Sequence, residues 1–265
     1  YSPRPEGFRR WGGKDQIAIL PVTGSIVDGG SAGDNPLPIP FLGGETTGDV
    51  SFAAALAQAV ADPDVVAIVV RVDSGGGSAV ASDKMYRALK SAQKKKPVVV
   101  SFGDIAASGG YYLAAGSPIF ASPVTITGSI GIFSGKVELD GLFALLGITT
   151  YTTKSNERAD MMSPYRPFTE AEKEHARNTL RAYYDRFLGV VAEGRKMAVE
   201  DVDKIARGRV WLGGAALERK LVDVRGGLWD AIAEAKARAG LAPDDDVGLR
   251  YVGTLGALSG LQRLV

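Results

Sequence analysis

The sequence predicts an α/β fold in which a mostly parallel sheet is covered by helices. Apolar runs alternate with segments of helical periodicity over the first 155 residues, which is typical of βα units. Residues 65–72 form a continuous run rich in β-branched side chains, as expected for a strand buried on both faces. This run and the next, residues 97–102, each lead into a glycine-containing turn, and ligands bind at the carboxyl ends of such strands.

Apolar runs and turn signals define the expected elements in order. Strands are expected at residues 17–22, 65–72, 97–102, 119–121, 125–132, 148–153, 210–212 and 221–223. Helices are expected at residues 51–61, 78–93, 111–115, 139–146, 169–194, 199–206 and 228–239, with a further one around Ala215. Residues 28–48 carry three prolines and several glycines and predict a long loop.

Boundary signals support two of these helices. Pro63 ends the helix at residues 51–61, because proline cannot continue a helix. Thr169 and Glu172 have the spacing of a capping box, which predicts the start of the long helix. The buried stripe of that helix is expected to be Leu180, Tyr184, Phe187, Leu188 and Val191.

Composition excludes several classes of function. The 265 residues carry a net charge of +1, so no basic surface for nucleic acid is predicted. The absence of cysteine excludes a thiol nucleophile, a cysteine zinc site and disulfides. One histidine and scattered acids offer no metal-ligand spacing, so the sequence predicts neither a metal site nor a cofactor.

The stretch at residues 105–112 places Ser108 where a nucleophile would stand. Ser108 follows a predicted strand and precedes Gly109 and Gly110, which let the chain turn and bring backbone N–H groups close to a ligand. The helix expected after them would direct those N–H groups at an anion. The alternative is a Ser-Gly-Gly turn without chemistry, and the local sequence leaves both open.

A second glycine turn, at residues 75–77, is expected beside the first. An N–H group of Gly76 or Gly77, together with that of Gly109, would form an oxyanion hole for acyl transfer. The alternative is a phosphate cradle, but no lysine follows with phosphate-loop spacing and no G-x-G-x-x-G occurs.

A serine nucleophile needs a base. The single histidine, His175, lies in a charged helical stretch that predicts a solvated face, so a Ser-His-Asp triad is poorly supported. A lysine whose pKa is lowered by burial is the natural alternative. Ser129 either holds such a lysine by a hydrogen bond or is a strand serine bonded to backbone.

Several motifs together resemble the signatures of the signal peptide peptidase A family, also called protease IV. They are residues 72–78 (VDSGGGS), 106–111 (AASGGY) and 127–131 (TGSIG), followed by matches at 162–164 (MSP) and 204–211 (KIARGRVW). The resemblance covers about residues 16–238. It implies a Clp-like serine peptidase with a crotonase-like ββα superhelix. The implied roles are nucleophile for Ser108, oxyanion donors for Gly76, Gly77 and Gly109, and hydrogen-bond partner of the catalytic lysine for Ser129.

The sequence departs from the family pattern at two places. Asp73 and Gly75 replace the Asn and Pro of the usual Asn-Ser-Pro-Gly-Gly turn, which is expected to alter stiffness more than chemistry. Ala159 stands where single-domain members carry the catalytic lysine. Long members split the dyad between a lysine-bearing N-terminal half and a serine-bearing C-terminal half, and the chain resembles the latter. An engineered substitution at Ala159, or Lys154 as a substitute base, are the alternatives.

Composition and the resemblance together predict what surrounds the site. Residues 1–15 are expected to be a linker or arm, residues 16–240 the catalytic domain and residues 241–265 a C-terminal tail. Because the chain starts at Tyr1 without methionine, a targeting or membrane-anchoring segment is expected to be missing. The implied work is cleavage of remnant signal peptides at the membrane of a bacterial cell envelope, with the catalytic domain in the periplasm. The implied partners are peptide substrates and either further copies of the chain or a lysine-bearing half.

Two other functions remain open from the sequence. An acyl-CoA enzyme of the crotonase type would also use a backbone oxyanion hole. It would need an adenine and phosphate pocket, and it would not require a serine after the strand. A catalytically inert scaffold half would keep the fold without a reactive Ser108. Binding of a CoA thioester and labelling of Ser108 by a fluorophosphonate distinguish these alternatives from a peptidase.

Overall fold

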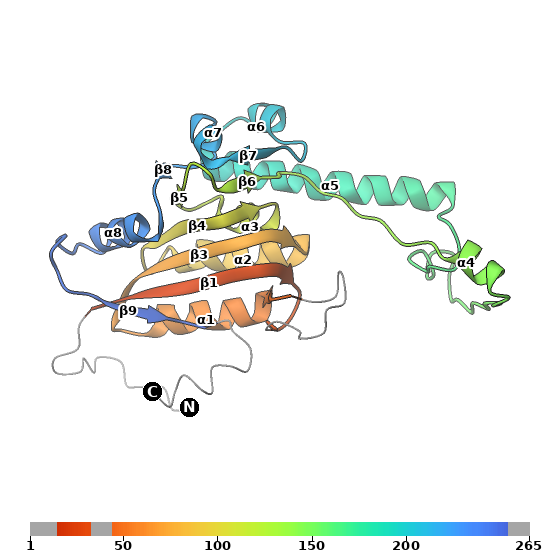
Figure 1. Cartoon of the computed structure of the whole chain (residues 1–265), viewed down its shortest axis with the longest axis horizontal. Coiled ribbons are helices and arrows are strands. Elements are labelled where there is room, and N and C mark those ends of the chain that lie inside the picture. The colour runs from red at the N-terminus through yellow and green to blue at the C-terminus, as the bar shows by residue number, and fades with distance from the viewer. Residues whose placement is uncertain (1–14, 33–43, 254–265) are drawn as a thin grey trace. The chain divides into compact units, whose positions relative to one another are not determined.

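A computed structural model describes residues 15–32 and 44–253 (Figure 1). The chain divides into a sheet unit, Tyr1–Gly131 with Phe187–Val265, and an inserted unit, Ile132–Arg186. None of the helices within the described ranges combines the length and the apolar character that crossing a membrane requires.

Nine strands of the described residues form one sheet in the sheet unit. Its main path runs through β2 (Thr46–Gly48), β1 (Gln16–Val27), β3 (Val65–Gly77), β4 (Val98–Ala107), β5 (Ile119–Ala121) and β8 (Val224–Arg225). β9 (Gly248–Tyr251) also pairs with β1, and β6 (Ile126–Gly128) pairs with both β4 and β7 (Val210–Leu212). The pairing of β6 with β7 is antiparallel and the other strand pairings are parallel, which confirms the predicted mostly parallel sheet.

Helices cover the sheet. α1 (Asp49–Ala61), α2 (Ala79–Ala92) and α3 (Gly109–Ala114) pack in a row, and α8 (Leu228–Arg238) packs on β3, β4 and β5 (Figure 1). α6 (Val199–Ile205) and α7 (Gly213–Glu218) come before and after β7. Residues 67–70 of β3 are all fully buried, as predicted for a strand covered on both faces. On one face, Ile17, Ile19 and Val69 pack against Ile232 and Ala235 of α8.

The ends of several elements differ from the prediction. β3 continues through the glycine turn, because Ser25 and Ile26 of β1 pair with Gly76 and Gly77. The strand expected at residues 221–223 lies instead at Val224–Arg225. No strand forms at residues 148–153. Residues 248–251, in the expected tail, pair with β1 as β9. Residues 1–14 of the expected arm and residues 33–43 of the expected loop lie outside the described residues.

The inserted unit contains α4 (Asp140–Leu145) and the first part of α5 (Glu170–Arg195), which ends in the sheet unit. The predicted capping box is confirmed: the Thr169 N–H donates to Glu172 Oε2 at 2.8 Å, and the Glu172 N–H donates to Thr169 Oγ1 at 3.2 Å. Of the predicted stripe, Phe187, Leu188 and Val191 are buried and the earlier Leu180 and Tyr184 are half-buried.

Arg166 holds the start of α5 in place through two carboxylates. Its guanidinium donates to both carboxylate oxygens of Glu172, at 2.8 and 2.6 Å, and to both of Asp160, at 2.8 and 2.7 Å. Bidentate pairs of this kind are the stronger class of charged hydrogen bond. Arg166, helped by the Thr169 N–H, lowers the pKa of Glu172 to about 2.

This pKa shift predicts an acid-sensitive inserted unit. The folded pKa of Glu172 lies below its ordinary value of 4.5, so the stabilisation is present above pH 4.5 and is lost as the pH falls towards about 2. Near-UV circular dichroism over this range should show loss of packing, and the Glu172→Gln variant should be less stable at neutral pH with a flatter pH dependence. Glu170→Gln, which removes an exposed ion pair with Lys173, is the control and should behave as the parent chain. Identical pH profiles for parent and Glu172→Gln would contradict the prediction.

Candidate active site

Ser108 sits at the junction of β4 and α3 in a strained conformation. Its φ is +51°, a region that costs a non-glycine residue about 1–3 kcal/mol and that clusters at functional sites. Its N–H donates to the Gly128 carbonyl at 2.9 Å, and its own carbonyl accepts from the Tyr112 N–H at 2.8 Å. The residue is half-buried, and no side chain in the described part of the chain hydrogen-bonds its hydroxyl.

The two predicted glycine turns are in direct backbone contact. Gly76 has a φ of +100°, and a Cβ placed on it would lie 2.5 Å from the Gly109 nitrogen and 2.9 Å from the Ser108 Cβ. A Cβ on Gly109 would lie 3.3 Å from the Gly77 nitrogen. Only glycine allows this approach, because any side chain would occupy the space between the turns. The structure thus brings Ser108 together with Gly76, Gly77 and Gly109.

The three predicted oxyanion donors differ in availability. The Gly76 N–H donates to Ser74 Oγ at 3.1 Å, and Ser74 Oγ donates in turn to the Gly24 carbonyl at 2.6 Å. The Gly76 N–H is therefore already used, and the contribution of Gly76 is the close approach of its Cα.

Gly77 and Gly109 carry N–H groups that suit an oxyanion hole. The Ser78 N–H donates to the Ile26 carbonyl of β1 at 2.8 Å. Successive N–H groups of a regular strand point to opposite edges, so we expect the Gly77 N–H to point away from β1. A Cβ on Gly109 would lie 3.3 Å from the Gly77 nitrogen, so this nitrogen lies close to Gly109. Gly109 is the first residue of α3, so its N–H has no acceptor within the helix.

Ser129 lies beside Ser108 through the pairing of β4 with β6. Ala107 and Gly128 are the last residues of the two strands and pair in parallel register, and Ser108 and Ser129 directly follow them. Ser129 also has a positive φ, +48°, and its N–H donates to the Arg209 carbonyl at 2.7 Å. Its role towards a lysine stays a prediction.

Trp211 holds the turn before Ser129. A Cβ on Gly128 would lie 2.8 Å from the Trp211 ring, so the indole packs directly on the Gly128 backbone. The indole N–H donates to the Ile205 carbonyl at 3.0 Å, and the Arg219 guanidinium lies 3.9 Å from the ring centroid. Trp211 thereby supports the carbonyl that binds the Ser108 N–H.

No lysine among the residues that the structure describes hydrogen-bonds Ser108 or Ser129. Lys84 and Lys90 pair with carboxylates, and Lys236 donates to two backbone carbonyls. Burial lowers the pKa of Lys96, as a catalytic base would need. However, Lys96 precedes β4, at the end of that strand opposite Ser108, and it donates to the Ala59 carbonyl at 3.0 Å.

The residues that the sequence analysis considered for the catalytic base, His175 and Lys154, lie in the inserted unit, as does Ala159, which stands at the position of the family lysine. Ala159 and His175 are exposed, and Arg158 Nη1 lies 3.4 Å from His175 Nδ1. Lys154 donates to Asp160 at 3.1 Å and to the Glu157 carbonyl at 3.2 Å. The described contacts of Lys154 are therefore local and ionic.

Sequence reasoning missed Lys136, which organises the Met-Ser-Pro block. Its ammonium donates to the carbonyls of Met161, Ser163 and Arg166 at 2.9, 3.1 and 2.7 Å, and lies 4.3 Å from the centroid of the Phe168 ring. Three carbonyls match the three donors of an ammonium group. Lys136 has no sequence signal, because its acceptors are backbone atoms that any residue would provide.

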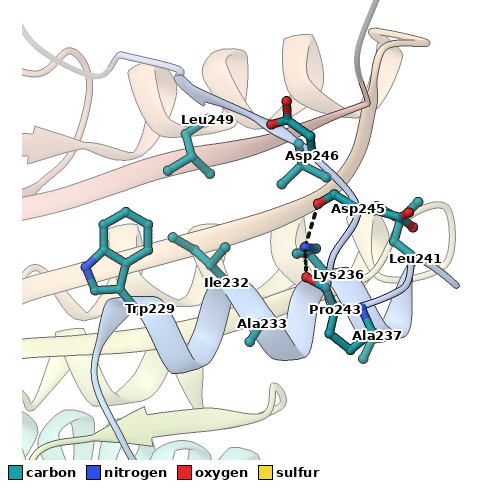
Figure 2. Close-up of a pocket in the computed structure, with 11 residues that line it drawn as sticks. Trp229, Ile232, Ala233, Lys236, Ala237, Leu241, Pro243, Asp245, Asp246 and Leu249 are labelled. Carbon is teal, nitrogen blue, oxygen red and sulfur yellow. Dashed lines mark hydrogen bonds between the residues drawn. The ribbon is translucent and has the colours of Figure 1, made fainter.

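A separate apolar pocket of about 440 Å³ lies between α8 and the chain leading into β9 (Figure 2). Trp229, Ile232 and Leu249 face it, and the Lys236 ammonium at its side donates to the carbonyls of Pro243 and Asp245 at 2.5 and 2.7 Å. None of the residues that line this pocket belongs to the site around Ser108. We therefore do not assign the pocket to the candidate active site.

The contact between the glycine turns predicts unequal effects of two neighbouring substitutions. Gly76→Ala should lower the free energy of unfolding by at least about 2 kcal/mol, because it combines a positive φ with a Cβ 2.5 Å from a backbone nitrogen. Gly75→Ala should change it by no more than about 0.5 kcal/mol, because its Cβ would meet only the end of Ile105, at 3.7 Å. Denaturant titration of both variants measures this, and equal losses would contradict the geometry.

Comparisons with known proteins place the chain among related sequences. The profile of peptidase family S49 matches residues 90–242, which include Ser108, Gly109 and Ser129. The chain is 35% identical over 254 residues to the chloroplastic serine protease SPPA of Arabidopsis thaliana, covering 92% of the chain and 36% of that protein.

Two bacterial relatives show the same relationship. Protease 4 of Haemophilus influenzae is 35% identical over 234 residues, covering 88% of the chain and 36% of that protein. The putative signal peptide peptidase SppA of Enterococcus faecium is 35% identical over 223 residues, covering 83% of the chain and 63% of that protein. The chain thus spans about a third of the length of the first two relatives. By the family match and these identities, the chain belongs to peptidase family S49.

Proposed function

We propose that the chain is the serine-bearing part of a serine endopeptidase with a Ser/Lys dyad, in which Ser108 is the nucleophile. The observation that carries this proposal is the unbonded Ser108 hydroxyl beside the N–H groups of Gly77 and Gly109. Family membership supports a peptidase over an acyl-CoA enzyme or an inert scaffold.

Catalysis would begin with attack of Ser108 Oγ on a peptide carbonyl, while a neutral lysine amine takes the hydroxyl proton. The carbonyl oxygen gains the negative charge, which the N–H groups of Gly77 and Gly109 stabilise. The lysine ammonium then protonates the leaving amine as the C–N bond breaks, leaving an acyl-enzyme. Water, deprotonated by the same amine, releases the acid and regenerates Ser108. The Ser129 hydroxyl would donate a hydrogen bond to the lysine amine, which would keep the amine neutral and directed at Ser108.

The lysine would come from another domain or chain. Two observations support a partner. First, the described lysines have no bond to Ser108 or Ser129, while Ala159 stands at the aligned position. Second, the inserted unit leaves large apolar side chains uncovered: α4 buries none of its residues, and Phe133 and Tyr151 are each 94% exposed. Apolar surface of this kind marks protein contact sites. Either further copies of the chain or a lysine-bearing half would cover it.

The proposed substrates are remnant signal peptides, and the proposed place of action is the bacterial cell envelope. The Enterococcus faecium relative carries the name of a putative signal peptide peptidase, which supports this substrate class. Membrane anchoring and a periplasmic catalytic domain complete the proposal. They would keep the site close to peptides released from the membrane.

The nucleophile is tested by Ser108→Ala in the native assembly. Hydrolysis of a fluorogenic peptide should fall by at least about a thousandfold, because no other group can form the acyl-enzyme. Ser91→Ala, an exposed serine on α2, should leave the rate unchanged. A fluorophosphonate should label the parent chain at Ser108 and leave Ser108→Ala unlabelled. Retained hydrolysis in Ser108→Ala would remove Ser108 from this role.

The source of the base is tested by comparing the purified chain with the native assembly. The chain alone should hydrolyse the same peptide at least about a hundredfold more slowly, since general base catalysis contributes that much. Lys154→Met should not change either rate, because Lys154 is bound to Asp160. Full activity of the chain alone, lost in Lys154→Met, would instead make Lys154 the base.

A further inference from the structure

A charged cluster lies directly behind the glycine turn of the site. Asp28, just after β1, accepts a hydrogen bond from the Ser78 hydroxyl at 2.5 Å and one from Lys84 at 3.1 Å. Lys84, on α2, also pairs with Asp49 at 2.8 Å. Asp49 is 5% exposed and accepts the Gly29 N–H at 2.6 Å. One ammonium thus joins the chain after β1, the start of α1 and the start of α2.

The cluster meets the proposed oxyanion hole at Ser78. Ser78 follows Gly77 directly, and its N–H donates to the Ile26 carbonyl at 2.8 Å. Its hydroxyl makes two different bonds: it accepts the Ala81 N–H at 3.2 Å as the N-cap of α2, and it donates its proton to Asp28. Capping needs only the acceptor function. The bond to Asp28 is an additional restraint on the Gly77–Ser78 segment.

Such a restraint matters because the glycines themselves do little to fix the turn, which is otherwise held by the pairing of Gly76 and Gly77 with Ser25 and Ile26 of β1. Residues 75–77 are three successive glycines, which have the widest choice of backbone angles. An oxyanion donor stabilises the transition state only if its N–H is fixed in direction before the reaction. Ser78 follows Gly77 directly, so its side chain, bonded to Asp28, can restrain the Gly77 backbone from one side, while Ser74 Oγ binds the Gly76 N–H on the other.

We infer that Asp28, held by Lys84 and Asp49, is a positioning residue that fixes the Gly77 N–H through Ser78. The inference rests on the proposed function and deepens it. The cluster touches no reacting atom: it acts by keeping the glycine turn in one orientation. A hydrogen bond to an ionised carboxylate suits this, because it is shorter and about twice as strong as a neutral one. Ser78 and Lys84 both lower the pKa of Asp28, so the carboxylate stays ionised at neutral pH.

The experiment compares four variants in the native assembly. Asp28→Ala and Lys84→Met should each lower kcat by about ten- to a hundredfold with KM within about twofold, because a misdirected donor weakens only transition-state binding. Asp28→Asn should recover much of kcat, since its amide oxygen can still accept from Ser78. Lys90→Met, on the same helix, breaks an exposed ion pair with Glu193 and is the matched control, expected to leave kcat unchanged.

Two further measurements separate positioning from folding. Affinity for a peptide boronate, which forms a tetrahedral adduct, should fall in Asp28→Ala in proportion to kcat. Ser78→Gly keeps an accepted N-cap residue for α2 but has no hydroxyl to donate to Asp28, so it should lose kcat while its melting temperature stays close to that of the parent.

The outcomes distinguish this inference from the proposed function. If Ser108→Ala abolishes hydrolysis but Asp28→Ala, Lys84→Met and Ser78→Gly keep the parent kcat and boronate affinity, the positioning role is wrong and the peptidase stands. If kcat falls only together with the melting temperature, the cluster is structural and the inference is likewise wrong. If Ser108→Ala retains activity, the proposed function itself fails.

Discussion

The contact between the Gly76 backbone and the Ser108–Gly109 turn is the constraint on which the candidate active site depends. It requires β3 and β4 to run side by side in parallel and to end at the same level, which their register provides up to the pair Ser74 and Ala106. It also requires that no Cβ stand between the turns, since one at Gly76 would lie 2.5 Å from the Gly109 nitrogen. The site therefore needs both the sheet register, which brings the two turns together, and the glycines, which allow their backbones to make contact.

The parts of this arrangement that the sequence predicts are those encoded locally. The run at residues 65–72 predicts a buried strand because its β-branched side chains suit both faces, and Ser108 is found because a serine followed by two glycines stands out after a strand. The hydrogen bond that occupies the Gly76 N–H cannot be predicted from the neighbouring residues. It depends on Ser74, whose hydroxyl bonds the Gly24 carbonyl 50 residues away in the chain. The ion pair between Lys84 and Asp28 could not be predicted from the sequence either, because the two residues are 56 positions apart.

Elsewhere the prediction was limited by what surrounds a segment rather than by its own residues. Residues 148–153 have strand-like composition, yet no described strand pairs with them and they stay irregular. Residues 248–251 alternate between half-buried and exposed and look irregular in sequence, yet β1 offers a free edge next to Gln16 and the segment becomes β9. β-propensity measures how well side chains fit a sheet that already exists, so it cannot decide where a partner edge is available.

Ser108 and Ser129 show why such a site needs a rigid surround. Both have a positive φ, +51° and +48°, although glycine would adopt that conformation at no cost. The proposed mechanism uses a hydroxyl at each position, so the strain, about 1–3 kcal/mol for each residue, has to be offset by bonds that a glycine would not need. Those bonds are visible: the Ser108 N–H is bound by Gly128, and the Ser129 N–H by Arg209. Because Gly128 lies beneath Trp211 and directly precedes Ser129, the restraints on the two serines are connected. The sheet unit therefore contains, by itself, the restraints that hold both serines in their strained conformations.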